Sequence, residues 1–250
     1  MARLIQRSIE KPRPCAYLAN RQASLETRLM LDVTPEELQR LLEHGWRRFG
    51  PAYFRPSCWG CSECIPVRVP IATFAPSQNL RRVQKRARHV RVEVSVPSVD
   101  GKRIALYRRW HANREAARGW EPEEGDPDDY AMNFCFPHPA ARELTYWEGE
   151  ELVAVAITDE TPDALSAVYC FHAPERAELS LGTLNVLAHV ELAREAGRKH
   201  LYLGYRVEGC PSLRYKGRFR PQERLVGMPR LDAEPEWQLE VTPSLPLLPR

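Results

Sequence analysis

The segment 200–221, HLYLGYRVEGCPSLRYKGRFRP, contains residue types that recognise nucleic acids. Its first six residues are mostly apolar or aromatic, which predicts a strand over 200–205. After a turn, cations and aromatic rings interleave from Arg214 to Arg220, and cations attract phosphates while rings stack on bases. The pattern predicts a binding site at the rim of a sheet. The alternative from the residues alone is a strand followed by a solvated basic loop.

A cysteine knuckle is the second chemical feature, because Cys58, Cys61 and Cys64 form a CxxCxxC run. Gly60 lets the backbone turn between two thiolates, so that both can bind one metal centre. Cys15 is the candidate fourth ligand of a tetrahedral site. The spacing predicts zinc or an iron–sulfur cluster, and the alternative is a tight turn held by reduced thiols.

The bulk composition favours a cytoplasmic globular protein. The 250 residues are 43% hydrophobic, which is enough for a buried core, and the formal net charge is +3. No apolar run approaches the roughly 20 residues of a membrane span, so we expect no membrane segment. No apolar block follows the amino-terminal charges, so we expect no secretory signal. A basic run over 81–91 and an acidic run over 121–129 predict a polyanionic partner at one place on the surface.

Local signals place these motifs in an α+β chain. Capping residues predict helices over 34–49, 77–89 and 180–196. The remaining elements are a helix over 102–118, an acidic loop over 121–129, and strands over 52–56, 65–74, 90–96, 151–158 and 164–171.

We predict three units along the chain. Residues 1–97 form an amino-terminal module with the cysteine knuckle and the basic helix. Residues 98–230 form a carboxy-terminal domain, after a turn that begins at residue 97. Prolines cluster at 235–249, which predicts a loose Pro-rich tail over 231–250.

The carboxy-terminal pattern YLGYxxxGCxxxxYKxxFRP resembles the signature of the aminoacyl-tRNA–protein transferases. This family comprises the arginyltransferases and the bacterial aspartate/glutamate leucyltransferases. The amino-terminal module resembles the same family at Cys15, Tyr17 and Leu18, and in the run from Phe54 to Val69 that carries the knuckle. The compact length favours the leucyl branch over the larger arginyl branch.

The resemblance implies acyl transfer on an α+β fold with an acetyltransferase-like (GNAT-type) mixed sheet. In that fold, a helix N-terminus beside a splayed pair of strands receives the acyl donor. The α-amine of a protein with N-terminal Asp or Glu would attack the ester of leucyl-tRNA, and the product would be marked for N-degron proteolysis. The implied partners are aminoacyl-tRNA and acceptor proteins with acidic N-termini. No cofactor is required for this chemistry.

Candidate site residues follow from the motifs and the resemblance. We expect Tyr205, Tyr215 and Lys216 to be catalytic, with Glu208 and Asp159 as further candidates for a base. The start of the long helix, at Ser180 and Gly182, is a candidate anion or oxyanion site. The cations expected to bind tRNA phosphates or the acceptor carboxylate are Arg81, Arg82, Lys85, Arg86, Arg214 and Arg218.

Three other functions remain open from the sequence. The same transfer would also work with arginyl-tRNA as donor. The knuckle and the basic helix fit a non-catalytic zinc-knuckle RNA-binding protein, but that function leaves the Tyr-Lys segment unexplained. A coenzyme-A-dependent N-acetyltransferase would need a QxxGxG/A loop before the long helix, where 180–183 offers only one glycine.

Overall fold

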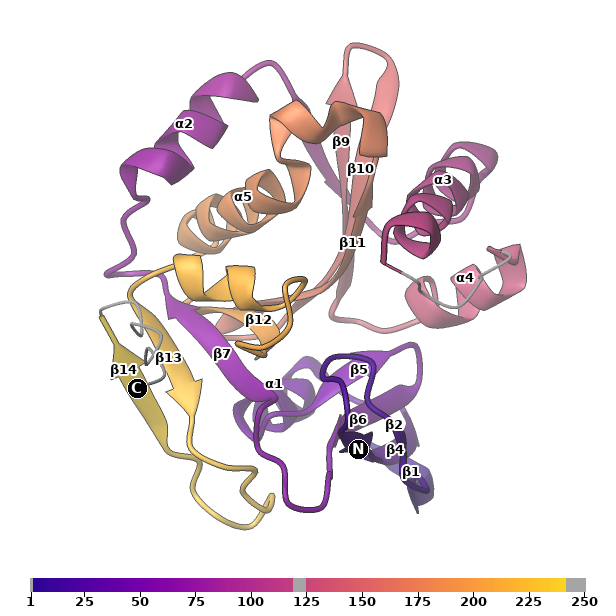
Figure 1. Cartoon of the computed structure of the whole chain (residues 1–250), viewed down its shortest axis with the longest axis vertical. Helices are drawn as coiled ribbons and strands as arrows, with labels where there is room; N and C mark the ends of the chain where they lie inside the picture. Colours follow the sequence, from indigo (N-terminus) through magenta and orange to yellow (C-terminus); the bar gives the residue numbers. More distant parts are fainter. Residues whose placement is uncertain (1, 119–124, 242–250) are drawn as a thin grey trace.

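The structure is a computed structural model that describes residues 2–118 and 125–241. It is a mixed α+β fold whose largest element is an eight-stranded sheet (Figure 1). The strand order in that sheet is β14 (Trp237–Glu240), β13 (Gln222–Leu225), β7 (Ile65–Pro70), β12 (His200–Arg206), β11 (Ala164–His172), β10 (Glu151–Glu160), β9 (Ala141–Glu148) and β8 (Arg91–Ser95).

Two smaller sheets lie in the amino-terminal part. The four-stranded one has the order β1 (Arg3–Ile9), β4 (Leu25–Leu31), β6 (Ala52–Pro56) and β5 (Arg47–Phe49). The other is the short pair of β2 (Arg13–Pro14) and β3 (Gln22–Ala23). The large sheet therefore takes β7 and β8 from the predicted amino-terminal module and its other strands from later in the chain. The division at residue 97 stays a prediction.

The helices cover both sides of the large sheet. They are α1 (Pro35–Glu43), α2 (Gln78–Arg86), α3 (Gly101–Arg118), α4 (Pro127–Phe134) and α5 (Leu181–Glu195), with 3₁₀ helices η1 (Pro174–Leu179) and η2 (Arg214–Arg218). Figure 1 shows α5 on one side of β11 and α3 with α4 on the other. Helix α5 buries an aliphatic face against β7 and β12, whereas α3 and α4 bury aromatic residues against β10 and β11. Each such side chain contributes about 1.5–3 kcal/mol when fully buried.

The parallel strands β11 and β12 separate after a short paired stretch. Their ladder runs only from Ala164 opposite His200 to Ser166 opposite Tyr202. Beyond it the register of β12 shifts at Gly204, whose φ of +81° is a conformation that favours glycine. Helix α5 lies between the two strands in the chain order. The separation opens the sheet next to the start of that helix.

Several sequence predictions of local structure need correction. The helix predicted over 34–49 has the expected capping box at Thr34 and Glu37 but ends at Glu43. Its continuation is blocked because Gly45 has φ +79° and β5 begins two residues later. The acidic stretch 121–129 is not all loop, since Asp126 caps α4 from Pro127 onward. Residues 119–124 lie outside the described part of the chain.

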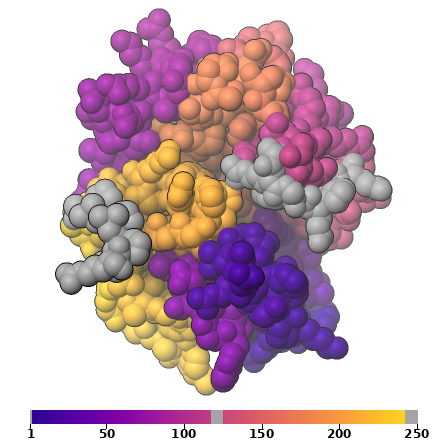
Figure 2. All heavy atoms as spheres, viewed as in Figure 1, coloured from indigo at the N-terminus to yellow at the C-terminus, as the bar shows by residue number. Residues whose placement is uncertain are grey.

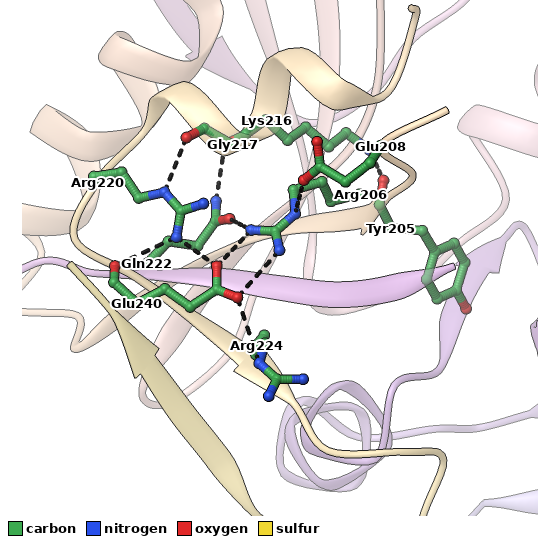
Figure 3. A network of polar contacts seen from close by, with 9 residues as sticks. All are labelled: Tyr205, Arg206, Glu208, Lys216, Gly217, Arg220, Gln222, Arg224 and Glu240. Carbon is green, nitrogen blue, oxygen red and sulfur yellow. Dashed lines mark hydrogen bonds and ion pairs between the residues drawn. The ribbon is translucent and has the colours of Figure 1, made fainter. Parts of the chain in front are cut away.

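The predicted loose tail contains an ordered strand. Residues 237–240 form β14, which pairs antiparallel with β13. Glu240 on β14 forms ion pairs with Arg206, Arg220 and Arg224 (Figure 3). Arg206 also donates to Gln222 at 2.6 Å, and Gln222 donates to the carbonyl of Lys216 at 2.9 Å. This network connects β14 to the backbone of η2. Residues 242–250 of the tail lie outside the described part.

Replacing Glu240 by Ala should destabilise the protein by about 2 kcal/mol, because it removes one of the two carboxylates that pair with the buried Arg206 and leaves only the exposed Glu208. Burial alone would raise the pKa of Glu240, but the hydrogen bonds from Arg206 and Arg220 outweigh it and lower the pKa. The stabilisation is therefore present at neutral pH and is lost as the pH falls through that lowered pKa. Urea unfolding at several pH values measures both effects. The exposed Glu234→Ala variant should stay within about 0.5 kcal/mol of wild type; equal losses in the two variants would contradict the role of the network.

Candidate active site

A cavity of about 560 Å³ opens where β11 and β12 separate. Ala167–Cys170 of β11 and Leu203–Tyr205 of β12 line it, and both runs begin just beyond the last paired residues. The other walls come from β5, α3, the start of α5 and the segment 211–216. This volume lies within the range of about 300–1,000 Å³ that is typical of ligand sites. The divergence of two strands therefore creates a space that a substrate can occupy.

The amino-terminal and carboxy-terminal motifs meet at this cavity. Tyr17, two residues after Cys15, lines it together with Lys216. A Cβ atom added to Gly209 would lie only 2.7 Å from Leu18, so these two segments are in close contact. Figure 2 shows the amino-terminal atoms side by side with those of the segment near residue 210. The segment next to Cys15 and the segment around Lys216 therefore border the same cavity, whereas the four knuckle cysteines are not among its described lining residues.

Two buried or partly buried cations occupy the point where the strands diverge. Arg47 of β5 donates from Nη2 to the carbonyl of Ala167, and Lys216 of η2 donates from Nζ to the carbonyl of Tyr205 at 2.9 Å. A Cβ atom at Gly204 would lie 3.4 Å from Lys216 Nζ and 3.5 Å from Arg47 Nε. Both cations thus border the same glycine, and each satisfies a carbonyl that the opened sheet leaves unpaired.

Lys216 has a strongly altered acidity. Burial first, and the charge of Arg47 second, lower the pKa of Lys216 to about 7. A large fraction of the amine is therefore uncharged at neutral pH and can accept a proton. Burial also lowers the pKa of Arg47, but a guanidinium remains charged in a protein.

An aromatic wall forms the apolar part of the cavity. Phe49 lies 5.5 Å from Phe54 and 5.9 Å from Tyr169, measured between ring centroids, and Tyr169 lies 5.8 Å from Trp110. All four side chains line the cavity, together with Val168. Such a surface suits an aliphatic side chain of a ligand.

The start of α5 forms the third functional part. Residues 180–183 line the cavity, so the first turn and the positive end of the helix dipole lie at its wall. A Cβ atom at Gly182 would meet only His172, at 3.9 Å, which leaves room for a ligand close to the backbone. Ser180 accepts a hydrogen bond from Arg86 at 3.0 Å. Ser180 and Gly182 therefore line the cavity, and their role as an anion or oxyanion site stays a prediction.

The three residues expected to be catalytic all line the cavity, but in different settings. Lys216 is the one with a near-neutral pKa. Tyr205 is buried, its hydroxyl donates to the Gly45 carbonyl at 2.8 Å, and burial raises its pKa. Burial, followed by the nearby Cys170, raises the pKa of Tyr215 to about 12. Both phenols therefore stay protonated at neutral pH.

The predicted tRNA-binding cations lie outside the cavity on the surface. Arg81, Arg82, Lys85 and Arg86 are exposed on α2, which packs against α5, and Arg214 and Arg218 are exposed on η2. Arg86 connects α2 to the cavity through its bond to Ser180. None of these six cations is among the described lining residues of the cavity.

The two further candidates for a base are occupied by ion pairs. Asp159 is 1% exposed and pairs with Arg48, so it neutralises a buried arginine. Glu208 pairs with Arg206 at 2.9 Å. Neither carboxylate lines the cavity.

The thiols of the knuckle lie close enough to influence one another. Burial, followed by the neighbouring Cys58, Cys15 and Cys61, raises the pKa of Cys64 to about 12. Cys58 interacts with the backbone of Ser24 at 3.4 Å. In the two described ranges, no group of three or more His, Cys, Asp or Glu side chains is arranged to hold a metal ion. Zinc or an iron–sulfur cluster at Cys15, Cys58, Cys61 and Cys64 therefore stays a prediction.

Sequence reasoning missed Arg47 and the aromatic wall. Arg47 was assigned to the end of a helix, although it belongs to β5. The available signal was the run Trp46-Arg47-Arg48-Phe49, in which two arginines stand between aromatic residues. All four are buried or partly buried, which the sequence alone does not reveal for arginine.

Comparisons with known proteins identify the family of the chain. The model of the arginine-tRNA-protein transferase N terminus matches residues 13–82, and that of its C terminus matches residues 102–226. The chain belongs to this arginine-tRNA-protein transferase family.

Individual relatives carry a more specific name. A protein named aspartate/glutamate leucyltransferase from Helicobacter hepaticus is 34% identical, and the match covers 95% of this chain and 98% of the relative. A protein of the same name from Halorhodospira halophila is 39% identical, with coverage of 85% and 91%. Among solved structures, L-PGS from Bacillus licheniformis has a TM-score of 0.43 at 15% identity, covering 68% of this chain and 50% of that one. No helix in the described part is both long and apolar enough to span a membrane.

The pKa of Lys216 can be measured directly because the chain has five lysines. In a heteronuclear NMR titration of the lysine side chains, we expect one signal that titrates near pH 7. The signal should be absent from Lys216→Met and present in the exposed control Lys11→Met. In Arg47→Gln its pKa should rise, because one source of repulsion is removed. If no lysine titrates between about pH 6 and pH 8, Lys216 is not poised for proton transfer.

Proposed function

We propose that this protein transfers leucine from leucyl-tRNA to the α-amine of proteins that begin with Asp or Glu. The observation that carries the proposal is one cavity that joins an aromatic wall to a lysine of near-neutral pKa, in a chain 34–39% identical to named aspartate/glutamate leucyltransferases. Aminoacyl-tRNA is a cytoplasmic substrate, so we infer a cytoplasmic enzyme that marks its products for N-degron proteolysis.

The chain's own residues supply what the acyl transfer needs. The acceptor α-ammonium loses a proton to the neutral Lys216, and the free amine attacks the carbonyl carbon of the leucyl ester. The first turn of α5, at Gly182, is placed to stabilise the oxyanion that forms. The bond to the ribose oxygen then breaks, and the second proton lost by the attacking nitrogen goes to that oxygen. Lys216 releases its own proton to solvent, so that an amide and a ribose hydroxyl replace the ester. Binding both reactants in one cavity supplies much of the remaining rate.

We also infer that the core of the fold is acetyltransferase-like. The support is the pair of parallel strands, β11 and β12, that are connected through α5 and separate beside its first turn. In this fold the opening between such strands receives the acyl donor. Here the donor would be the aminoacylated end of a tRNA, whose phosphates meet the exposed cations of α2 and η2.

Arginyl-tRNA is a poorer donor on electrostatic grounds. The cavity is lined by Arg47, Arg48, Arg114 and Lys216, and no Asp or Glu is among its described lining residues. A cationic donor side chain would be repelled there, whereas the isobutyl group of leucine packs on the aromatic wall. The remaining alternative is a non-catalytic zinc-knuckle protein that binds RNA.

The decisive assay combines leucyl- or arginyl-tRNA with peptides that begin with Asp, Glu, Lys or Ala. We expect transfer of leucine to the Asp and Glu peptides. Transfer of arginine would overturn the donor assignment, and tRNA binding without any transfer would indicate the RNA-binding alternative. Lys216→Met should lower kcat by about 10²–10⁴-fold because it removes the base, with leucyl-tRNA affinity retained. The control Lys11→Met should keep wild-type activity, and activity of Lys216→Met equal to wild type would exclude Lys216 as the base.

The contribution of α2 to tRNA binding can be tested by salt dependence. The double variant Arg82→Gln, Lys85→Gln should bind leucyl-tRNA more weakly, and the slope of log K against log salt should fall by about 0.7–0.9 per lost phosphate contact. Arg230→Gln, an exposed arginine between β13 and β14, serves as the matched control. Identical slopes for all three proteins would place the tRNA elsewhere.

A further inference from the structure

Two cations of the cavity, Arg47 and Lys216, have no carboxylate partner among the described residues. Arg47 is 9% exposed, and within residues 2–118 and 125–241 neither Arg47 nor Lys216 forms an ion pair with a carboxylate. The adjacent Arg48 shows the usual arrangement, because it pairs with the buried Asp159. Leaving a charge buried and unpaired is costly, so a cation of this kind favours the binding of an anion.

The geometry of Arg47 suits a carboxylate. Its bond to the Ala167 carbonyl uses one of the five N–H donors of the guanidinium. The structure records no second acceptor for it among the described residues, and its Nε faces the open side of Gly204. A guanidinium in this state can bind a carboxylate through two parallel hydrogen bonds.

The position of Arg47 relative to Lys216 suits one particular carboxylate. Both groups border Gly204, which has no side chain to fill the space between them and the cavity. The first residue of an acidic acceptor carries an α-amine and a carboxylate only a few bonds apart. If the amine lies at Lys216, where it gives up its proton, the carboxylate of the same residue lies on the side of Arg47.

We infer that Arg47 determines acceptor specificity by binding the side-chain carboxylate of the N-terminal Asp or Glu. The inference rests on the proposed leucyl transfer and adds the residue that selects the acceptor. It also moves that role from the exposed arginines of α2, where the sequence had placed it, to a buried one. The exposed cations of α2 and η2 remain available for tRNA phosphates, which a buried guanidinium reaches less readily.

The test compares pairs of peptides that differ only in the charge of their first residue, Asp against Asn and Glu against Gln. Wild type, Arg47→Gln and Arg47→Lys are assayed for kcat/KM with leucyl-tRNA. Arg47→Gln should lower kcat/KM for the acidic peptides by about 10- to 100-fold, the range expected for a charge-assisted hydrogen bond. Activity on the amide peptides should fall less than activity on the acidic peptides, because an amide side chain offers no carboxylate to Arg47, so the Asp:Asn ratio decreases. Arg47→Lys should give an intermediate ratio, because it keeps the charge and loses the planar fork.

A partly buried arginine outside the cavity controls for general damage to the fold. Arg55 is held by Glu26 outside the cavity, and Arg55→Gln should leave the Asp:Asn ratio unchanged. If Arg47→Gln lowers transfer to Asp and Asn peptides equally and weakens tRNA binding, Arg47 contacts a phosphate and the inference is wrong. If Arg47→Gln does not fold, the ratio in Arg47→Lys decides, and a wild-type ratio there also overturns the inference.

Peptide binding measured in the absence of tRNA tests the acceptor site independently of the proposed leucine transfer. Fluorescence anisotropy should show that wild type binds the Asp peptide more tightly than the Asn peptide and that Arg47→Gln loses this difference. If that result holds but no leucine is transferred, the acceptor site is correct and the proposed reaction is wrong. If leucine is transferred and Arg47 affects neither binding nor the ratio, the reaction is correct and this inference is wrong.

Discussion

The separation of β11 and β12 is the constraint on which the site depends. Two parallel strands that part inside a protein expose backbone carbonyls that water cannot reach freely, and each needs a donor. Here the donors for Ala167 and Tyr205 are the side chains of Arg47 and Lys216. The need to supply hydrogen bonds to these carbonyls thus brings two cations to the place where the sheet opens. The same opening admits a substrate, so the structural requirement and the chemical one coincide.

These two donors come from parts of the chain that are distant in sequence, and each is supported from outside the cavity. Arg47 stands on β5, which pairs with β6 of the small sheet. Lys216 stands on η2, whose carbonyls are bound by Gln222 and Arg220 (Figure 3). Glu240 of β14 in turn holds Arg220. The chain therefore contributes to its active site from near both ends, through contacts that fix the backbone and leave the cavity side of Lys216 open.

The parts of this arrangement that are local in sequence were predictable. Thr34 and Glu37 specify a helix start because capping acts within one turn, and the alternating residues at 91–95 specify a strand because side chains alternate along it. The motif around Lys216 indicated the family. Arg47 was not predictable, because its burial depends on a carbonyl 120 residues away. The strand at 237–240 was hidden by flanking prolines, since its stability comes from pairing with β13 and from arginines on other elements.

One set of charges accounts for both specificities of the proposed reaction. The positive charge of Arg47 and Lys216, which pair with no carboxylate among the described residues, attracts an acidic side chain on the acceptor and repels a basic side chain on the donor. An apolar donor avoids the conflict, because the aromatic wall binds it without a charge. Acceptor binding also affects the proposed base, because burial first and the charge of Arg47 second hold the pKa of Lys216 low, and a carboxylate at Arg47 offsets the second of these causes. The residue proposed to bind the acceptor carboxylate and the residue proposed to take the proton are thereby electrostatically linked.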